Sequence, residues 1–155
     1  MKKLVISITI LFILTGCTKD EVTYEKETYL ALKEDLITTV EFTGYEDLPC
    51  DITLYLNRVN DEELSYLVII DNPKEDMYNI KAIAIHDYYT EDIFPSIGIF
   101  DDSIDLTLDS ESNNGITLGG YIESMDDIEI LEARIYLEYT NSNGETNIIY
   151  YKTTN

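Results

Sequence analysis

Residues 133–151 read ARIYLEYTNSNGETNIIYY, and this is the part of the chain whose sequence indicates its structure most clearly. In the first half, Ala133, Ile135, Leu137 and Tyr139 alternate with more polar residues, as in a strand with one buried face. The dipeptide Asn143-Gly144 follows, and it favours the tight turn of a β-hairpin. Because the second half is again rich in β-branched and aromatic residues, the stretch predicts two antiparallel strands.

Similar short runs, separated by turn-forming residues, fill the chain between residue 45 and this hairpin. The run 64–70, LSYLVII, is nearly all apolar, which favours a strand buried on both faces. Gly119-Gly120 indicates a bulge or a close backbone approach inside another run. We expect strands at residues 52–56, 64–70, 79–86, 97–100, 104–108, 116–122, 133–139 and 147–151. The pattern predicts an all-β fold, an antiparallel immunoglobulin-like β-sandwich of about 7–8 strands.

Residues 66–87, YLVIIDNPKEDMYNIKAIAIHD, carry a likeness to known modules. They resemble the strand, Asn/Pro turn and strand of small extracytoplasmic immunoglobulin-like or fibronectin-like modules. The likeness rests on the alternation of apolar residues and on a few turn residues. It implies the sandwich fold and carries no functional residues.

The N-terminus has a different character. Lys2 and Lys3 precede an apolar run of 11 residues, Leu4 to Leu14, which is shorter than the about 20 residues of a membrane-spanning helix. The run ends in Leu14-Thr15-Gly16-Cys17. This segment resembles the signal peptide and lipobox of bacterial lipoproteins. The resemblance implies cleavage between Gly16 and Cys17 and a diacylglyceryl group on the Cys17 sulfur; the alternative is an uncleaved apolar helix with an incidental cysteine.

The expected organisation is therefore a cleaved signal peptide (1–16), a lipidated tether and short helix (17–44) and a β-sandwich domain (45–155). Residues 18–28 are polar and charged, as in a tether off the membrane, although they could also begin a helix. After them, one face of an amphipathic helix is indicated by apolar residues at spacings of three and four, namely Tyr29, Leu32, Leu36 and Val40. The competing interpretation is a strand near residues 37–42, which are rich in β-branched side chains.

Composition excludes several classes of function. The chain has 31 Asp and Glu against 10 Lys and Arg, a formal charge of −21, and removal of Lys2 and Lys3 would make it −23. Such a balance argues against a nucleic-acid partner, because affinity for phosphate backbones comes mainly from basic side chains. One His and two Cys exclude His-rich or multi-Cys metal frameworks, and we expect no cofactor.

Two single residues are candidates for chemistry. His86 stands beside Asp87 at the end of an expected strand, which is half of a catalytic triad, but no Gly-x-Ser-x-Gly nucleophile motif accompanies it. We expect His86 to be a surface residue. Cys50 is the only thiol left if Cys17 is lipidated. We expect Cys50 to be a small buried hydrophobe, with an intermolecular disulfide as the alternative.

Acidic and tyrosine residues offer two kinds of binding site. Asp101, Ser103 and Asp105 have the alternating spacing of oxygen ligands for Ca²⁺, although no EF-hand pattern surrounds them. The alternative for this and the other acidic clusters, including Asp126-Asp127, is a solvated surface. Tyr residues give contact surface at low entropic cost, and the candidate binding loop is Tyr88 and Tyr89; the alternative is that Tyr is used here simply as a good strand former. Further Tyr residues fall on expected strands, at Tyr55, Tyr66, Tyr121, Tyr136 and Tyr150.

We expect a lipid-anchored extracytoplasmic binding or adaptor module of unknown ligand, without catalytic activity. Its partners would be the cell membrane, through the diacylglyceryl anchor on Cys17, and an envelope protein or glycan. The alternatives are a structural envelope lipoprotein and a small hydrolase or calcium-dependent surface protein. A cleft that joins His86 to a Ser or to Cys50 would favour the enzyme, and converging carboxylates would favour the metal.

Overall fold

The computed structural model describes residues 18–90, 92–109, 115–123 and 128–155. The predicted signal peptide, with Gly16 and Cys17, lies outside these residues, and so does Asp126-Asp127. Among the described residues, no helix has both the length and the apolar character that crossing a membrane requires.

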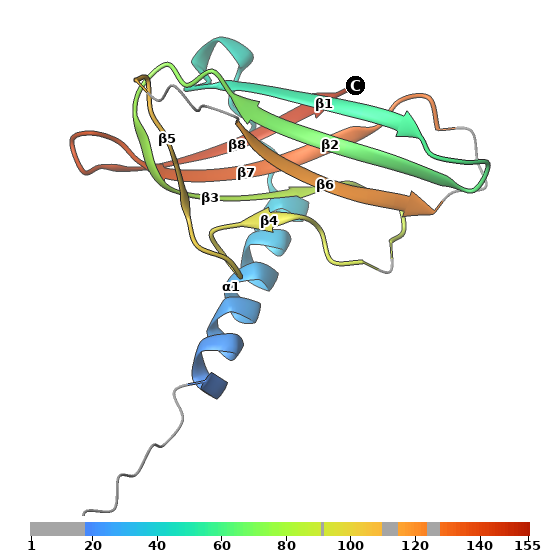
Figure 1. Ribbon diagram of the computed structural model, residues 1–155, viewed down its shortest axis with the longest axis horizontal. Coiled ribbons are helices and arrows are strands. Elements are labelled where there is room, and N and C mark those ends of the chain that lie inside the picture. Colours follow the sequence, from blue (N-terminus) through green and yellow to red (C-terminus); the bar gives the residue numbers. More distant parts are fainter. Residues whose placement is uncertain (1–17, 91, 110–114, 124–127) are drawn as a thin grey trace, which may run out of the picture.

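The described chain forms two packed antiparallel sheets with a helix at the N-terminal end (Figure 1). The first sheet has the strand order β1-β2-β6, and the second has the order β4-β3-β7-β8, with β5 paired to β3. The strands are β1 Asp51–Arg58, β2 Glu63–Asp71, β3 Met77–Ile85, β4 Ser96–Ile97, β5 Ile104–Leu106, β6 Ile116–Glu123, β7 Glu132–Thr140 and β8 Thr146–Thr154. A short 3-10 helix, η1 Tyr45–Asp47, precedes β1.

This strand order is that of an immunoglobulin-like sandwich. In the letters of that fold, β1, β2 and β6 stand in the places of A, B and E, and β3, β7 and β8 stand in those of C, F and G. Strand β4 adds a short C′ strand beside C. The expected all-β sandwich is therefore confirmed, including the hairpin of β7 and β8 around Asn143-Gly144.

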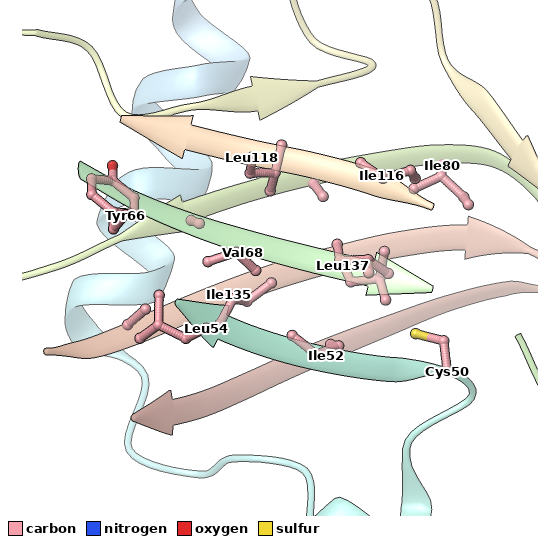
Figure 2. Close-up of a cluster of buried hydrophobic side chains, with 14 of the residues drawn as sticks. Cys50, Ile52, Leu54, Tyr66, Val68, Ile80, Ile116, Leu118, Ile135 and Leu137 are labelled. Carbon is pink, nitrogen blue, oxygen red and sulfur yellow. The ribbon is translucent and has the colours of Figure 1, made fainter. Parts of the chain in front are cut away.

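The core lies between the sheets, where inward side chains of both pack together (Figure 2). Every second residue of β7 points inward, as the alternation in the sequence predicted. Residues of β1, β2 and β6 meet them from the opposite sheet. Fully or nearly fully buried members include Ile52, Leu54, Val68, Ile70, Ile80, Ile116, Leu118, Ile135 and Leu137.

The strand buried on both faces is β3, not β2. In β2, burial alternates, and Leu67 on the outer face is 36% exposed, so the expectation for residues 64–70 was wrong. In β3, residues 82–85 are all buried, because helix α1 packs on the outer face of this sheet and covers Ile83 and Ile85. The apolar run 64–70 therefore predicted a strand correctly. It did not predict burial of both faces, because that depends on which sheet the helix covers.

Helix α1 spans Thr18–Thr38 and therefore includes residues 18–28, which we expected to be a tether. Its second half packs on the sheet through Tyr29, Leu32 and Leu36, three of the four predicted residues. Val40 is 88% exposed because the helix has ended at Thr38. The first half projects away from the sandwich (Figure 1), and Tyr24 on it is 70% exposed.

Irregularities in two strands, β4 and β3, have identifiable reasons. Strand β4 is shorter than the run 97–100 predicted, because Gly98 follows it with a φ of +69°. Strand β3 has a register shift between Met77 and Ile80, where Asn79 adopts a φ of +53°. The Asn79 backbone N–H donates to the Asp105 carboxylate at 2.8 Å, which holds β5 against this bulge.

Candidate binding face

The outer face of the β1-β2-β6 sheet has a central area without any charged residue. Register aligns outward residues of the three strands in rows across this face. Tyr55, Leu67 and Gly119 form the middle row. The two neighbouring rows are Thr53, Ile69 and Thr117 on one side and Asn57, Ser65 and Tyr121 on the other. We call these nine residues the uncharged face.

Two rows of carboxylates bound the uncharged face. Asp51 is paired with Asp71 at one end of the strands, and Glu63 is paired with Glu123 at the other end. Within the described ranges, none of these four carboxylates is in an ion pair. Apolar and hydroxyl-bearing side chains therefore form a strip between two negative ends.

Glycines shape the middle of this strip. A Cβ atom on Gly119 would lie 2.8 Å from Cδ2 of Leu67, and one on Gly120 would lie 2.7 Å from the Tyr66 hydroxyl oxygen. Of the two predicted explanations for these glycines, the bulge is absent, because the register of β2 with β6 continues unbroken; a close approach is present, made by side chains of β2. The space next to them is filled by Leu67 on the outside and by Tyr66 on the inside.

Two of the predicted tyrosines lie on the uncharged face. Tyr55 is 49% exposed and Tyr121 is 51% exposed, and Leu67 lies between their strands. Tyr66 and Tyr136 are buried and serve the core instead. The sequence did not single out Leu67, Ile69 or the four flanking carboxylates, because their alignment depends on which strands pair.

The predicted binding loop lies elsewhere, after β3. Tyr88 and Tyr89 are both exposed, and the ring of Tyr88 lies 6.2 Å from that of His86. Arg134 of β7 forms an ion pair with Asp87 beside them. The loop therefore presents two tyrosines to solvent, but no described element joins them to the uncharged face.

His86 is buried, so the expectation of a surface residue was wrong. Its ring makes edge-on contacts with Tyr66 at 4.9 Å and with Phe94 at 5.0 Å, because the chain after β3 folds back over it. Within the described part of the chain, neither ring nitrogen has a hydrogen-bond partner of normal geometry. Burial lowers the pKa of His86, and the Tyr88 backbone and Asp87 act in the opposite direction. Burial of the ring therefore favours the neutral imidazole over the imidazolium.

Cys50 lies at the other end of the sandwich from His86. Asp51, next to Cys50, is paired with Asp71, whereas His86 contacts Tyr66, five residues earlier in β2. At roughly 3.3 Å per residue these positions are about 16 Å apart along the strand. Cys50 is fully buried, and burial followed by the charge of Asp51 raises the pKa of its thiol to about 12. The two residues do not share a cleft, and the thiol is protonated at neutral pH.

The candidate calcium ligands lie in and just before β5. Asp101, Ser103 and Asp105 are all exposed, and Asp105 is engaged with the backbone of Asn79. Among the residues that the structure describes, no group of three His, Cys, Asp or Glu residues is placed to hold a metal ion. Asp105 therefore has a structural explanation in the bulge of β3.

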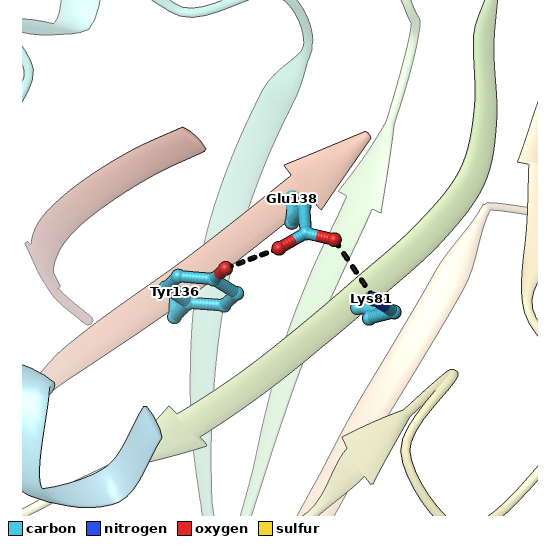
Figure 3. A network of polar contacts seen from close by, with 3 residues as sticks. All are labelled: Lys81, Tyr136 and Glu138. Atoms are coloured by element: carbon cyan, nitrogen blue, oxygen red, sulfur yellow. Dashed lines mark hydrogen bonds and ion pairs between the residues drawn. The ribbon is translucent and has the colours of Figure 1, made fainter. Parts of the chain in front are cut away.

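The opposite face of the sandwich carries a polar network beside the helix (Figure 3). Glu138 accepts a hydrogen bond from the Tyr136 hydroxyl at 2.5 Å and pairs with the Lys81 ammonium at 2.9 Å. Burial alone would raise the pKa of Glu138, but the two hydrogen bonds outweigh burial and lower it. The carboxylate is fully engaged by its neighbours, and it joins β3 to β7 rather than facing a ligand.

An open hollow of about 490 Å³ lies where α1 ends, beside β8. Asp35, Thr38 and Glu41 contribute polar groups to it, and Tyr150 forms part of its wall. Burial and the charge of Asp35 raise the pKa of Tyr150. Its polar lining residues are exposed or half-buried, so the hollow is a surface depression and not an enclosed ligand cavity.

Comparison with protein-family models, with curated proteins and with solved structures found no match to this chain. The candidate site is therefore built on the geometry of this chain alone.

Proposed function

We propose that the chain is a lipid-anchored extracytoplasmic binding module that contacts a partner through the uncharged face. The observation that carries the proposal is the exposure of Tyr55, Leu67 and Tyr121 together on the outer face of one sheet, which helix α1 does not cover. The chain has 31 acidic residues, yet this area of three strands carries no charge. An exposed surface of this kind is typical of a contact site, whereas a surface that meets only solvent has no need of it.

The chemistry of the face suits protein contact. Tyrosine is enriched in the buried centre of interfaces, because its ring gives a large apolar area and its hydroxyl a hydrogen bond. Leu67 and Ile69 add aliphatic surface, and Thr53 and Thr117 add hydroxyl groups. A partner that covers this area would remove apolar surface from water at about 25 cal/mol per Å².

The anchor half of the proposal rests on the lipobox. A single acyl chain binds a membrane only marginally, whereas the two chains of a diacylglyceryl group are enough for stable anchoring. Helix α1 begins directly after Cys17 and packs on the β3-β7-β8 sheet, so the uncharged face lies on the other side of the sandwich. An anchor at Cys17 would therefore leave that face uncovered by the chain's own attachment.

The test uses the full chain in its own cells. The Cys17→Ser variant is expected to lose acyl label and membrane fractionation, and a photoreactive residue in place of Tyr121 is expected to crosslink a partner. The matched control places the same residue at Tyr45, which is 61% exposed but lies outside the face. Persistent acyl label in the Ser variant would exclude the anchor, and equal crosslinking at both positions would exclude the face.

A further inference from the structure

The two carboxylate rows at the ends of the uncharged face indicate which charge a partner surface would carry. Asp71 and Glu63 are eight residues apart on β2, which is about 26 Å at roughly 3.3 Å per residue. Each row joins two paired strands: Asp51 and Asp71 lie side by side on β1 and β2, and Glu63 and Glu123 lie side by side on β2 and β6. Each end of the strip therefore presents two neighbouring carboxylates. A surface laid along this strip meets negative charge at both ends and none between them.

A second copy of the chain fits this arrangement poorly. Two such faces stacked about a two-fold axis with their strands aligned, parallel or antiparallel, would bring a carboxylate row of one copy against a carboxylate row of the other. Like charges that face each other across an interface oppose association, and the whole chain carries a charge of −21. The face therefore disfavours homodimers while leaving its apolar centre available.

A neutral glycan fits poorly as well. It would cover Tyr55 and Tyr121 but would leave the four end carboxylates without opposite charge. Leu67 and Ile69, which lie on the middle strand, are aliphatic and gain most from an apolar partner surface. Both features favour a protein over a sugar.

We infer that the partner is a protein whose contact surface is apolar and hydroxyl-bearing at its centre and carries Lys or Arg at both ends, about 26 Å apart. This inference rests on the proposed function and names the class of partner. Opposite charges at the rim align the partner along the strands and accelerate encounter, while the uncharged centre supplies the buried contact. Binding is accordingly expected to weaken as salt rises.

The experiment places a photoreactive p-benzoylphenylalanine at Leu67 of the full chain in its own cells, and the crosslinked peptide is identified by mass spectrometry. A first variant neutralises the four end carboxylates, and a control variant neutralises four exposed acids away from the face. The first carries Asp51→Asn, Asp71→Asn, Glu63→Gln and Glu123→Gln; the control carries Glu27→Gln, Glu34→Gln, Asp102→Asn and Asp109→Asn. Unfolding midpoints of both variants show that the fold is retained.

The expected result is an adduct to a protein segment flanked by Lys or Arg, with a dissociation constant for the purified pair that rises roughly tenfold in the first variant and stays unchanged in the control. Replacement of the partner's basic residues by Glu is expected to weaken wild-type binding and to restore part of it with Asp71→Lys. An adduct to a second copy, to a glycan or to a surface without basic residues would overturn the inference but leave a binding face. Equal weakening in both variants would also overturn it. Absence of any adduct at Leu67 would overturn the proposed function together with the inference.

Discussion

Replacing His86 by Phe isolates the effect of one proton on the stability of the fold. The chain contains one His, and its ring is only 5% exposed, between Tyr66 and Phe94. Because burial lowers the pKa of His86, the unfolded state binds a proton more readily than the folded state does. Stability is therefore complete above the unfolded pKa of about 6.5 and is lost as pH falls toward the lowered folded pKa.

The size of the effect follows from linkage. If the folded imidazole stays neutral throughout, lowering the pH from 7.5 to 5.5 costs the wild type about 1.4 kcal/mol more than the Phe variant. Charged groups near the site act in both directions: Asp87, which pairs with Arg134, favours the imidazolium and reduces the figure, whereas Lys33, which lies over the Phe94 ring, opposes the imidazolium. The Phe ring keeps the edge-on aromatic contacts, so the variant is expected to be at least as stable as the wild type at pH 7.5.

The measurement is urea unfolding of protein starting at Thr18, followed by circular dichroism at half-unit steps between pH 5.5 and 7.5. The terminal amine is common to both proteins, so any titration of it cancels in the difference. Asp87→Asn is the control, since it retains His86 and removes a charge that favours the imidazolium, so the pH dependence should be retained or strengthened. Parallel curves for the wild type and the Phe variant, or a wild type that gains stability on acidification relative to that variant, would refute the buried neutral imidazole.

Three further outcomes are expected. Gly120→Ala should lower the free energy of unfolding by about 1–3 kcal/mol in urea titration, since the added Cβ would lie 2.7 Å from the Tyr66 hydroxyl; an unchanged midpoint would show that Tyr66 has room to move. Leu36→Ala should cost about 2–5 kcal/mol and accelerate amide exchange over residues 29–38, because this side chain is fully buried under the helix; unchanged exchange there would mean that α1 is not docked. Ca²⁺ and Mg²⁺ at matched ionic strength should shift the unfolding midpoint equally, because Asp101, Ser103 and Asp105 are exposed and Asp105 already accepts a hydrogen bond from the Asn79 backbone; a saturable shift specific to Ca²⁺ would contradict this.

Local patterns were sufficient for most strands. The alternation in 133–139 and the Asn143-Gly144 turn depend only on neighbours in the sequence, and both appear in the structure as predicted. The burial of His86 was not predictable in this way, because it depends on Phe94 and Tyr66 arriving from other segments. A polar residue after a strand looks exposed until the chain that folds over it is known.

The uncharged face shows the same limit at the level of a site. Tyr55 and Tyr121 could be picked from the sequence as tyrosines on strands, but so could the buried Tyr66 and Tyr136. What separates them is the pairing of β2 with β6, across many intervening residues, and this pairing places Leu67 between the two exposed rings. The residues of the uncharged face are brought together by the pairing of strands that are distant in the sequence, and composition alone does not predict that pairing.

Helix α1 also has a consequence for geometry at a surface. A flexible tether lets a domain face in any direction. A helix packed on the domain instead fixes the domain's distance from the attachment point and its rotation about the helix axis. From Thr18, where α1 begins, to Tyr29, the first buried residue between positions 22 and 38, is 11 residues, or about 17 Å at roughly 1.5 Å per residue. Each residue inserted into the helix before Tyr29 would move the sandwich by about 1.5 Å along the helix axis and turn it by about 100° around that axis. For a chain anchored at Cys17, the number of residues in α1 before Tyr29 would therefore set both the distance of the sandwich from the membrane and the direction in which its uncharged face points.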